Sequence, residues 1–261
     1  MKMLLCLSSG FTPRYRQDIL RAISMPVGTI LRFRYDLELV NDSLKKKIRE
    51  DGLKDEEVCI AYLDRTTDVK KDPEIVPCRA AKIRASSTLG GFCILDLEIN
   101  EFLVTRNISS FNNTIANPVH NLPKRRGDNL TGEFCLPLTH DPSSLIKTED
   151  LADWQSLVTE LRKHKDFESE RFFYFVRGVF ESIQNKPVKL SQDAYSISSD
   201  RDYEINILQF SPGETNEVLS VKDSAHLILD ANRNSIEFLT NETLHVDSGY
   251  DEKRCDLEQQ A

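Results

Sequence analysis

Long apolar runs are absent from this sequence of 261 residues. A membrane-spanning helix needs ~20 apolar residues, and the best candidate segment, residues 172–180, is interrupted by Arg177. The N-terminal apolar run ends at Leu7 and is shorter than the ~7 to 15 residues of a signal-peptide core. These absences predict a cytoplasmic chain without membrane contact, in which residues 1–7 form a buried first strand.

The common catalytic motifs are absent as well. The chain has no G-x-S-x-G, no G-x-x-x-x-G-K-[ST], no H-E-x-x-H and no C-x-x-C motif. A hydrolase nucleophile turn, a P-loop and the commonest zinc sites therefore lose their usual sequence support. We expect no metal and no cofactor, and the sequence names no catalytic residue.

Disulfide bonds are not indicated by the cysteine positions. Most of the cysteines lie in apolar or alternating segments that are typical of strands, where a free cysteine behaves as a small hydrophobic residue. They are predicted to be free, buried thiols. The six positions are Cys6, Cys59, Cys78, Cys93, Cys135 and Cys255.

Three short segments contain residues with chemical potential, and each also has a plain reading as a turn. His140 beside Asp141 could act as a general base. The segment 247–251, Asp-Ser-Gly-Tyr-Asp, is rich in oxygen ligands but lacks the spacing of a calcium loop. Gly10 follows two serines at the end of the first strand, and one glycine cannot cradle a phosphate. Turn chemistry is the favoured interpretation of all three.

Charge is distributed unevenly along the chain. Residues 1–126 have a net charge of +5, and residues 127–261 have a net charge of −13. Surfaces of opposite charge attract different partners. The sequence therefore predicts that the two halves bind different molecules, or that the halves of neighbouring copies bind each other.

The N-terminal part, residues 1–118, is predicted to be a basic, β-rich domain. Residues 13–24 show helical spacing and end before a proline. Residues 30–40 alternate with a period of two, which is typical of a half-buried strand. Further strands are expected at 58–63 and on both sides of Gly90-Gly91, a pair that favours a hairpin turn. Together they predict a small barrel-like or curved antiparallel sheet.

The remainder is predicted to be a connector followed by an acidic domain. Residues 106–148 have a loop composition, and helices are expected at 151–161 and 172–183, so residues 119–186 are assigned as a linker with two amphipathic helices. Short apolar segments from 203 to 246 predict a β-sandwich-like domain over residues 187–261. The fold class is therefore α+β and mostly β.

Basic side chains of the N-terminal domain are the candidate binding residues. On a curved sheet they could contact phosphates, with tyrosines nearby to stack on bases. The alternative is that they pair with carboxylates on a solvated sheet face. The candidates are Arg32, Arg34, Arg79, Arg84, Lys124, Arg125 and Arg126.

Two functions follow from these observations. The first is an intracellular, non-enzymatic adaptor or regulatory subunit that acts through protein–protein interaction or self-association. The second is a nucleic-acid-binding protein or a metal-independent, small-barrel endoribonuclease, in which Arg32, Arg34 or Arg79 would stabilise charge at the scissile phosphate.

Overall fold

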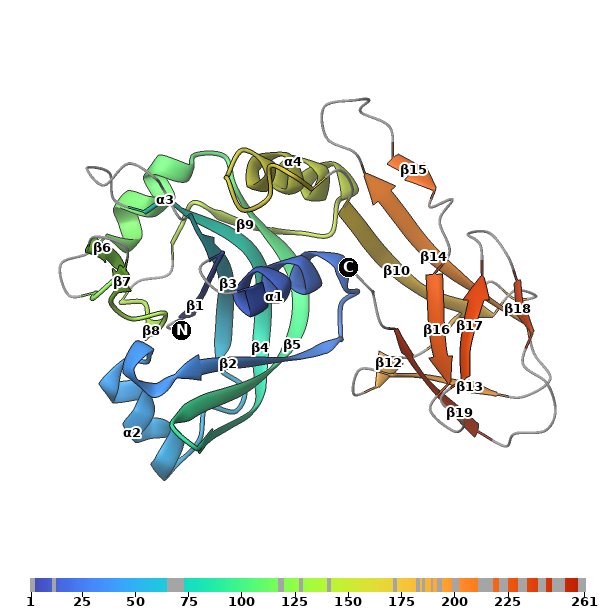
Figure 1. Cartoon of the computed structure of the whole chain (residues 1–261), viewed down its shortest axis with the longest axis horizontal. Helices are drawn as coiled ribbons and strands as arrows, with labels where there is room; N and C mark the ends of the chain where they lie inside the picture. Colours follow the sequence, from blue (N-terminus) through green and yellow to red (C-terminus); the bar gives the residue numbers. More distant parts are fainter. Residues whose placement is uncertain are drawn as a thin grey trace. The chain divides into compact units, whose positions relative to one another are not determined.

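The computed structural model describes residues 3–10, 13–64, 73–116, 120–126, 129–139, 142–170 and 173–181, and shorter segments between 184 and 257 that are mostly strands (Figure 1). The fold is mostly β, and the described residues contain four α-helices. The chain forms two compact units, Met1–Ile23 with Ile30–Arg171 and Ser24–Thr29 with Phe172–Ala261. Residues 119–171 thus belong to the same compact unit as the N-terminal sheet. The domain boundaries at residues 118 and 186, which rest on composition, stay predictions.

A seven-stranded sheet forms the core of the first unit, in the order β2-β5-β4-β3-β1-β8 with β9 added to β5. β1 and β3 run parallel, and every other neighbouring pair in this sheet is antiparallel. The strands are β1 (Leu4–Ser9), β2 (Ile30–Asp36), β3 (Glu57–Leu63), β4 (Ile75–Leu89), β5 (Phe92–Thr105), β8 (Cys135–Pro137) and β9 (Leu145–Thr148).

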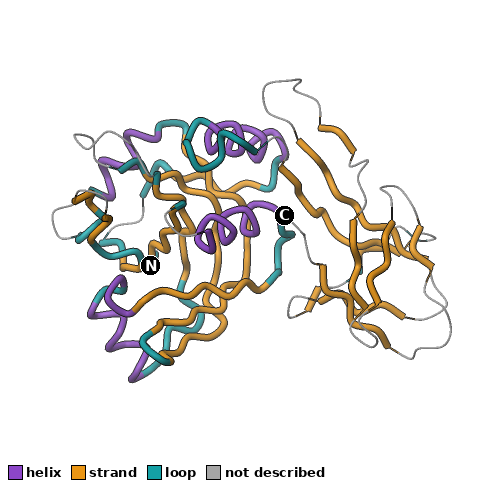
Figure 2. Tube along the Cα trace, viewed as in Figure 1, coloured by secondary structure: helices purple, strands orange, loops and turns teal. Residues whose placement is uncertain are grey.

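The sheet curls so far that the chain just beyond one edge strand, β2, contacts the other edge strand, β8. A bridge links Val40, beyond the end of β2, to Cys135 of β8. On either side of it, the amide of Phe134 donates to the carbonyl of Leu39 at 2.7 Å and the amide of Asn41 donates to the carbonyl of Cys135 at 2.9 Å. The predicted curved or barrel-like sheet is confirmed as a curled half-barrel (Figures 1 and 2).

Helix α1 (Pro13–Ser24) has the predicted bounds and packs against the inward-facing side chains of the sheet. Its Tyr15 ring stacks on Tyr35 of β2, with centroids 6.0 Å apart. In β2, Leu31, Phe33 and Tyr35 are buried while Arg32 and Arg34 are exposed, so the period-two prediction is confirmed as far as Asp36. Beyond it the prediction is wrong, because Leu37–Leu39 form a short 3-10 helix in which no residue is buried.

Helix α4 (Leu151–Arg162) begins at Asp150, whose side chain accepts a hydrogen bond from the amide of Ala152. The indole nitrogen of its buried Trp154 donates to the carbonyl of Ile23 at 3.1 Å. This bond joins α4 to the last turn of α1 and satisfies the only polar atom of the tryptophan side chain.

Two segments outside the predicted strands and helices are ordered elements. The charged segment after residue 40 contains α2 (Asp42–Glu50), which is capped by Asn41 and buries Leu44 and Ile48, four residues apart on one face. The expected linker 106–148 contains α3 (Ile108–Ile115), the ribbon of β6 (Lys124–Arg126) with β7 (Asn129–Thr131), and strands β8 and β9. The prediction that this segment is an irregular linker is therefore wrong. The sequence does not reveal β8 and β9 because strands of only three or four residues show no periodicity.

The second predicted helix is instead strand β10 (Phe173–Glu181), which pairs with β14 (Asp202–Phe210). The register shifts between Val176 and Gly178. A bulge adds one unpaired residue there, so the buried side chains of Val176 and Val179, three residues apart, lie on one face of the strand. This spacing imitates one face of a helix, which explains the error.

The second unit contains two antiparallel five-stranded sheets. The expected strands between 203 and 246 coincide with β14 to β18. One sheet has β11 (Lys186–Pro187), β10, β14, β15 (Val218–Ser220) and β18 (Thr243–His245); the other has β12 (Leu190–Ser191), β13 (Ala194–Ser198), β19 (Glu252–Leu257), β16 (Ala225–Leu229) and β17 (Asn234–Phe238). Within the described parts of the chain, no helix is long and apolar enough to cross a bilayer.

Candidate functional site

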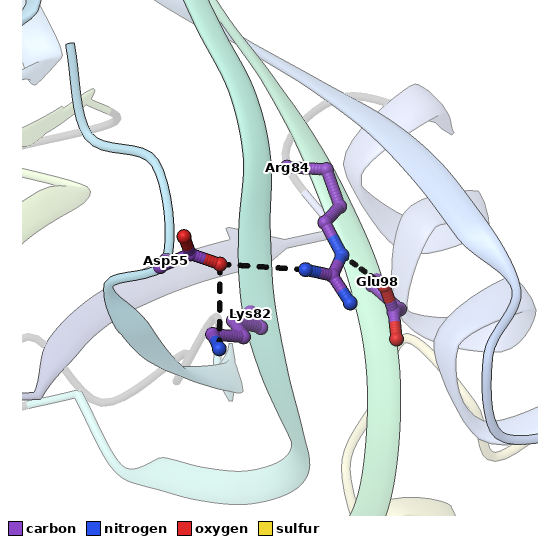
Figure 3. A network of polar contacts seen from close by, with 4 residues as sticks. All are labelled: Asp55, Lys82, Arg84 and Glu98. Carbon is purple, nitrogen blue, oxygen red and sulfur yellow. Dashed lines mark hydrogen bonds and ion pairs between the residues drawn. The ribbon is translucent and has the colours of Figure 1, made fainter.

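Two of the predicted basic residues are ion-paired on the sheet face. Arg32 donates from two nitrogens to both carboxylate oxygens of Asp96, at 2.7 and 3.0 Å. Arg84 contacts Glu98 on the neighbouring strand, and its second contact, to Asp55, measures 3.3 Å (Figure 3). These arginines are held by carboxylates of the same face, as the alternative interpretation of the sequence expects.

Arg79 is buried in the sheet. Its Nε donates to the carbonyl of Asn100 at 2.6 Å, and its guanidinium lies 3.8 Å from the centroid of the Phe102 ring. Burial lowers the pKa of Arg79 to about 9, against the opposing effect of Glu149 and Glu101. With this pKa the side chain stays charged at neutral pH, but it is 0% exposed and has no access to a phosphate outside the protein.

The other predicted basic residues lie on separate elements. Arg34 is exposed on β2, with its guanidinium 4.3 Å from the centroid of the Phe92 ring. Lys124 lies in the two-stranded β6–β7 ribbon, outside the seven-stranded sheet. The backbone of Arg125 and Arg126 belongs to the same ribbon, and their side chains lie outside the described residues.

The charge asymmetry changes when it is counted by compact unit. The first unit has 26 basic and 26 acidic residues, and the second has 8 basic and 16 acidic residues. The whole net charge of −8 therefore falls on residues 172–261. The apparent basic half arises because a division at residue 126 separates the acidic residues 127–171 from the sheet to which they belong.

The strongest cluster of polar side chains lies at the carboxyl ends of the parallel strands β1 and β3. Ser8 pairs with Tyr62 and Ser9 with Leu63. Since side chains alternate along a strand, Ser8, Tyr62 and Asp64 share one face. In open α/β sheets this end of the parallel strands commonly binds ligands, although here only β1 and β3 are parallel.

The segment 163–170, which follows α4, covers these strand ends. The hydroxyl of Tyr62 donates to Oδ2 of Asp166 at 2.7 Å. Nδ1 of His164 lies 3.3 Å from Oδ1 of Asp64. Arg16 of α1 donates from Nε to the carbonyl of Asp166 at 2.8 Å and is ion-paired with Glu170.

Electrostatics at this cluster favour a protonated imidazole. Burial alone would lower the pKa of His164, but the hydrogen bond that its ring donates to Asp64 and the charges of Asp64, Glu74 and Glu160 outweigh burial, and the pKa is raised. The other ring nitrogen, Nε2, and the hydroxyl of Ser8 are buried, and neither has a hydrogen-bond partner among the residues that the structure describes.

The contact between Asp64 and His164 resembles the arrangement in which a carboxylate orients a histidine for proton transfer. A base of this kind must lie within hydrogen-bond distance of the group whose proton it takes. Nε2 of His164 has no such contact to Ser8 or Ser9. The cluster therefore acts in this conformation as a closed polar contact between strands and segment 163–170.

A cavity of about 610 Å³ lies beside α3, between Glu74 and Lys124. Its histidine, His120, is fully bonded: Nδ1 contacts the carbonyl of Ile115 at 2.8 Å, and Nε2 accepts from the amide of Thr139 at 3.1 Å. These bonds fix the neutral tautomer with the proton on Nδ1.

No group of three or more metal-ligating residues is assembled among the residues whose placement is described. His140, Asp141 and segment 247–251, which the sequence marked as candidates, lie outside those residues.

Sequence reasoning missed the cluster because its parts are far apart in the chain. Gly10 and the two serines before it give an apolar strand a polar end, a pattern that is also typical of a turn. His164 and Asp166 carry no local pattern that would connect them to residue 62 or 64. Comparison with family models, curated proteins and solved structures finds no match for this chain.

Proposed function

We propose that the chain is a non-enzymatic adaptor or regulatory subunit that acts through protein–protein interaction, with its second unit docking on a basic protein surface. The observation that carries this proposal is the location of the entire net charge of −8 on residues 172–261. An acidic surface accelerates encounter with a basic partner and disfavours acidic ones.

The neutral first unit supports a separate partner over head-to-tail association between copies. Opposite charges could join neighbouring copies only if one unit were basic, and the first unit has equal numbers of basic and acidic residues. The pairing of Arg32 with Asp96 and of Arg84 with Glu98 further reduces the charge that its sheet face offers.

Two finer statements accompany this proposal. The two antiparallel sheets of the second unit are proposed to pack as a β-sandwich, which is the usual arrangement for two such sheets in one compact unit. A cytoplasmic location is proposed because five cysteines are free and buried, as expected in a reducing compartment.

The test is capture of partners by the full chain at low and at high salt. The matched variants each change six carboxylates to amides, in residues 172–261 or at exposed positions of the first unit. We expect partners with basic surfaces that are lost at high salt and with the first variant only. Partners retained by the first variant, or none at low salt, would contradict the acidic docking surface.

The alternative, a nucleic-acid-binding or ribonuclease function, rests on Arg34. This side chain is exposed and stacked on Phe92, an arrangement that could contact a phosphate or a base. Fluorescence anisotropy with short RNA and DNA across salt concentrations tests it. Steeply salt-dependent binding that is lost in Arg32→Ala/Arg34→Ala would favour this alternative, and no binding at low salt would remove it.

A further inference from the structure

Cys6 of β1 and Cys135 of β8 face each other across the strand pair at one edge of the curled sheet. The two residues are in direct register, and their sulfur atoms lie 3.8 Å apart. On the same ladder, the amide of Leu7 donates to the carbonyl of Phe134 at 2.7 Å, one position from the cysteines, and the amide of Leu138 donates to the carbonyl of Met3 at 2.9 Å, three positions away. By alternation, Cys6 and Cys135 form a non-hydrogen-bonded pair, the kind in which opposite side chains approach most closely.

This geometry is compatible with a covalent bond. Non-hydrogen-bonded pairs have Cα atoms about 4.5 Å apart, within the ~4.4–6.8 Å that disulfides span. We propose that Cys6 and Cys135 are a reversible redox pair, which forms a disulfide across β1 and β8 in the folded chain when it meets a low-molecular-weight disulfide such as oxidised glutathione.

The reaction balances as two thiol–disulfide exchanges. One cysteine loses its proton and attacks oxidised glutathione, which forms a mixed disulfide and releases one glutathione thiolate. The second cysteine then loses its proton and attacks the sulfur of the first, which forms the bond between Cys6 and Cys135 and releases the second glutathione. The protein loses two electrons and two protons, and one glutathione disulfide becomes two thiols.

Burial makes the reaction depend on local opening. Both side chains are 0% exposed, and the hydrogen bond with Cys6 together with burial raises the pKa of Cys135 well above its ordinary value. A buried thiol reacts slowly. β8 is only three residues long, so its detachment is a small opening that exposes both thiols at once.

Oxidation would then fix the closure of the sheet. The disulfide would join β1 to β8 covalently. Because Cys135 also forms the backbone bridge to Val40, the disulfide would hold β8 next to the chain that follows β2. Cys59 and Cys78 direct their sulfur atoms toward backbone carbonyls of Ile60 and Val76. They are therefore internal references for thiols that should stay reduced.

The experiment treats the folded full chain, without denaturant, with graded ratios of oxidised to reduced glutathione. Free thiols are then blocked at low pH, and the disulfides are mapped by peptide mass spectrometry. We expect a peptide linking Cys6 to Cys135 whose fraction rises with the ratio and returns to zero with dithiothreitol. A disulfide that closes so long a loop should raise the melting temperature by roughly 5 °C or more.

Three variants sharpen the result. Cys6→Ala and Cys135→Ala should each abolish the linked peptide and the thermal shift, whereas Cys93→Ala, at an equally buried position of β5, should retain both. The mapping on the unsubstituted chain stands by itself if a variant fails to fold. Linkage of another pair, linkage only after unfolding, or no linkage at the most oxidising ratio would overturn the proposal.

Discussion

The carboxylate of Asp166 occupies the space that a side chain on Gly10 would need. A β-carbon added to Gly10 would lie 1.9 Å from Cγ of Asp166, far inside contact distance. The glycine at the end of β1 is therefore required by close approach of segment 163–170. What looks like a turn residue in the sequence is the point at which two distant parts of the first unit meet.

Gly10→Ala should lower the free energy of unfolding by about 1–3 kcal/mol, the usual cost of overpacking. Urea unfolding measures the loss. In a chain that already carries Asp166→Ala, the same change should cost much less, since the clash is gone. Equal losses in both backgrounds would show that Gly10 is constrained by something other than Asp166.

Replacing the exposed and the buried arginines of the sheet by alanine should lower the free energy of unfolding by different amounts. Arg84→Ala removes a partly exposed ion pair with Glu98 and should cost less than about 1 kcal/mol. Arg79→Ala removes a buried side chain from the Phe102 ring and the Asn100 carbonyl, and should cost at least about 2 kcal/mol. Chemical denaturation of the two variants checks this, and similar losses would contradict the assignment of Arg79 as structural.

Local periodicity was sufficient to predict much of the first unit. β1 and β3 follow from short apolar runs, β2 from alternation and α1 from helical spacing. The β4–β5 hairpin follows from Gly90 and Gly91, which both have positive φ (56° and 84°). These signals are contained within each segment, so no knowledge of packing is needed to interpret them.

The remainder depends on contacts that local patterns do not encode. A bulge gave β10 the spacing of a helix, and β8 is too short to show a period although it closes the sheet. The polar cluster combines Asp64 with His164, 100 residues later in the chain. Only the parallel pairing of β1 with β3 and the course of the chain after α4 bring these groups together.

Asp18 of α1 should make stability fall as the pH rises. Burial raises the pKa of Asp18 to about 6, against the opposing charges of Arg14 and Arg21. Between about pH 4 and pH 6 the folded state holds a proton that the unfolded state has lost, so rising pH penalises folding by up to about 2–3 kcal/mol. Below that window the penalty vanishes, and above it the penalty is constant.

The measurement is urea unfolding at several pH values across this window. Asp18→Asn should remove the contribution of Asp18 and unfold at higher urea than the unsubstituted chain at pH 7. Asp51→Asn, at the exposed end of α2, should leave the slope unchanged. An unaltered slope in Asp18→Asn would mean that the buried carboxyl is not the titrating group.

Removing the charge of Asp64 should reverse the pKa shift of His164, from raised to lowered. Burial lowers the pKa of this imidazole, and the Asp64 hydrogen bond and charge, with Glu74 and Glu160, more than offset burial. The protonated histidine therefore stabilises the fold, fully below the ordinary pKa of ~6.5 and progressively less as the pH rises through the higher folded value.

An NMR titration of the His164 ring reads this balance directly. In the unsubstituted chain its pKa should lie above 6.5, the value of an unperturbed histidine. Asp64→Asn removes the nearest charge, 3.3 Å away, and leaves burial dominant, so the pKa should fall below that value. Glu160→Gln removes a weaker contribution and should lower the pKa less. A pKa that Asp64→Asn leaves unchanged would show that the carboxylate does not hold the proton on His164, and that segment 163–170 is fixed by Tyr62 and Arg16 alone.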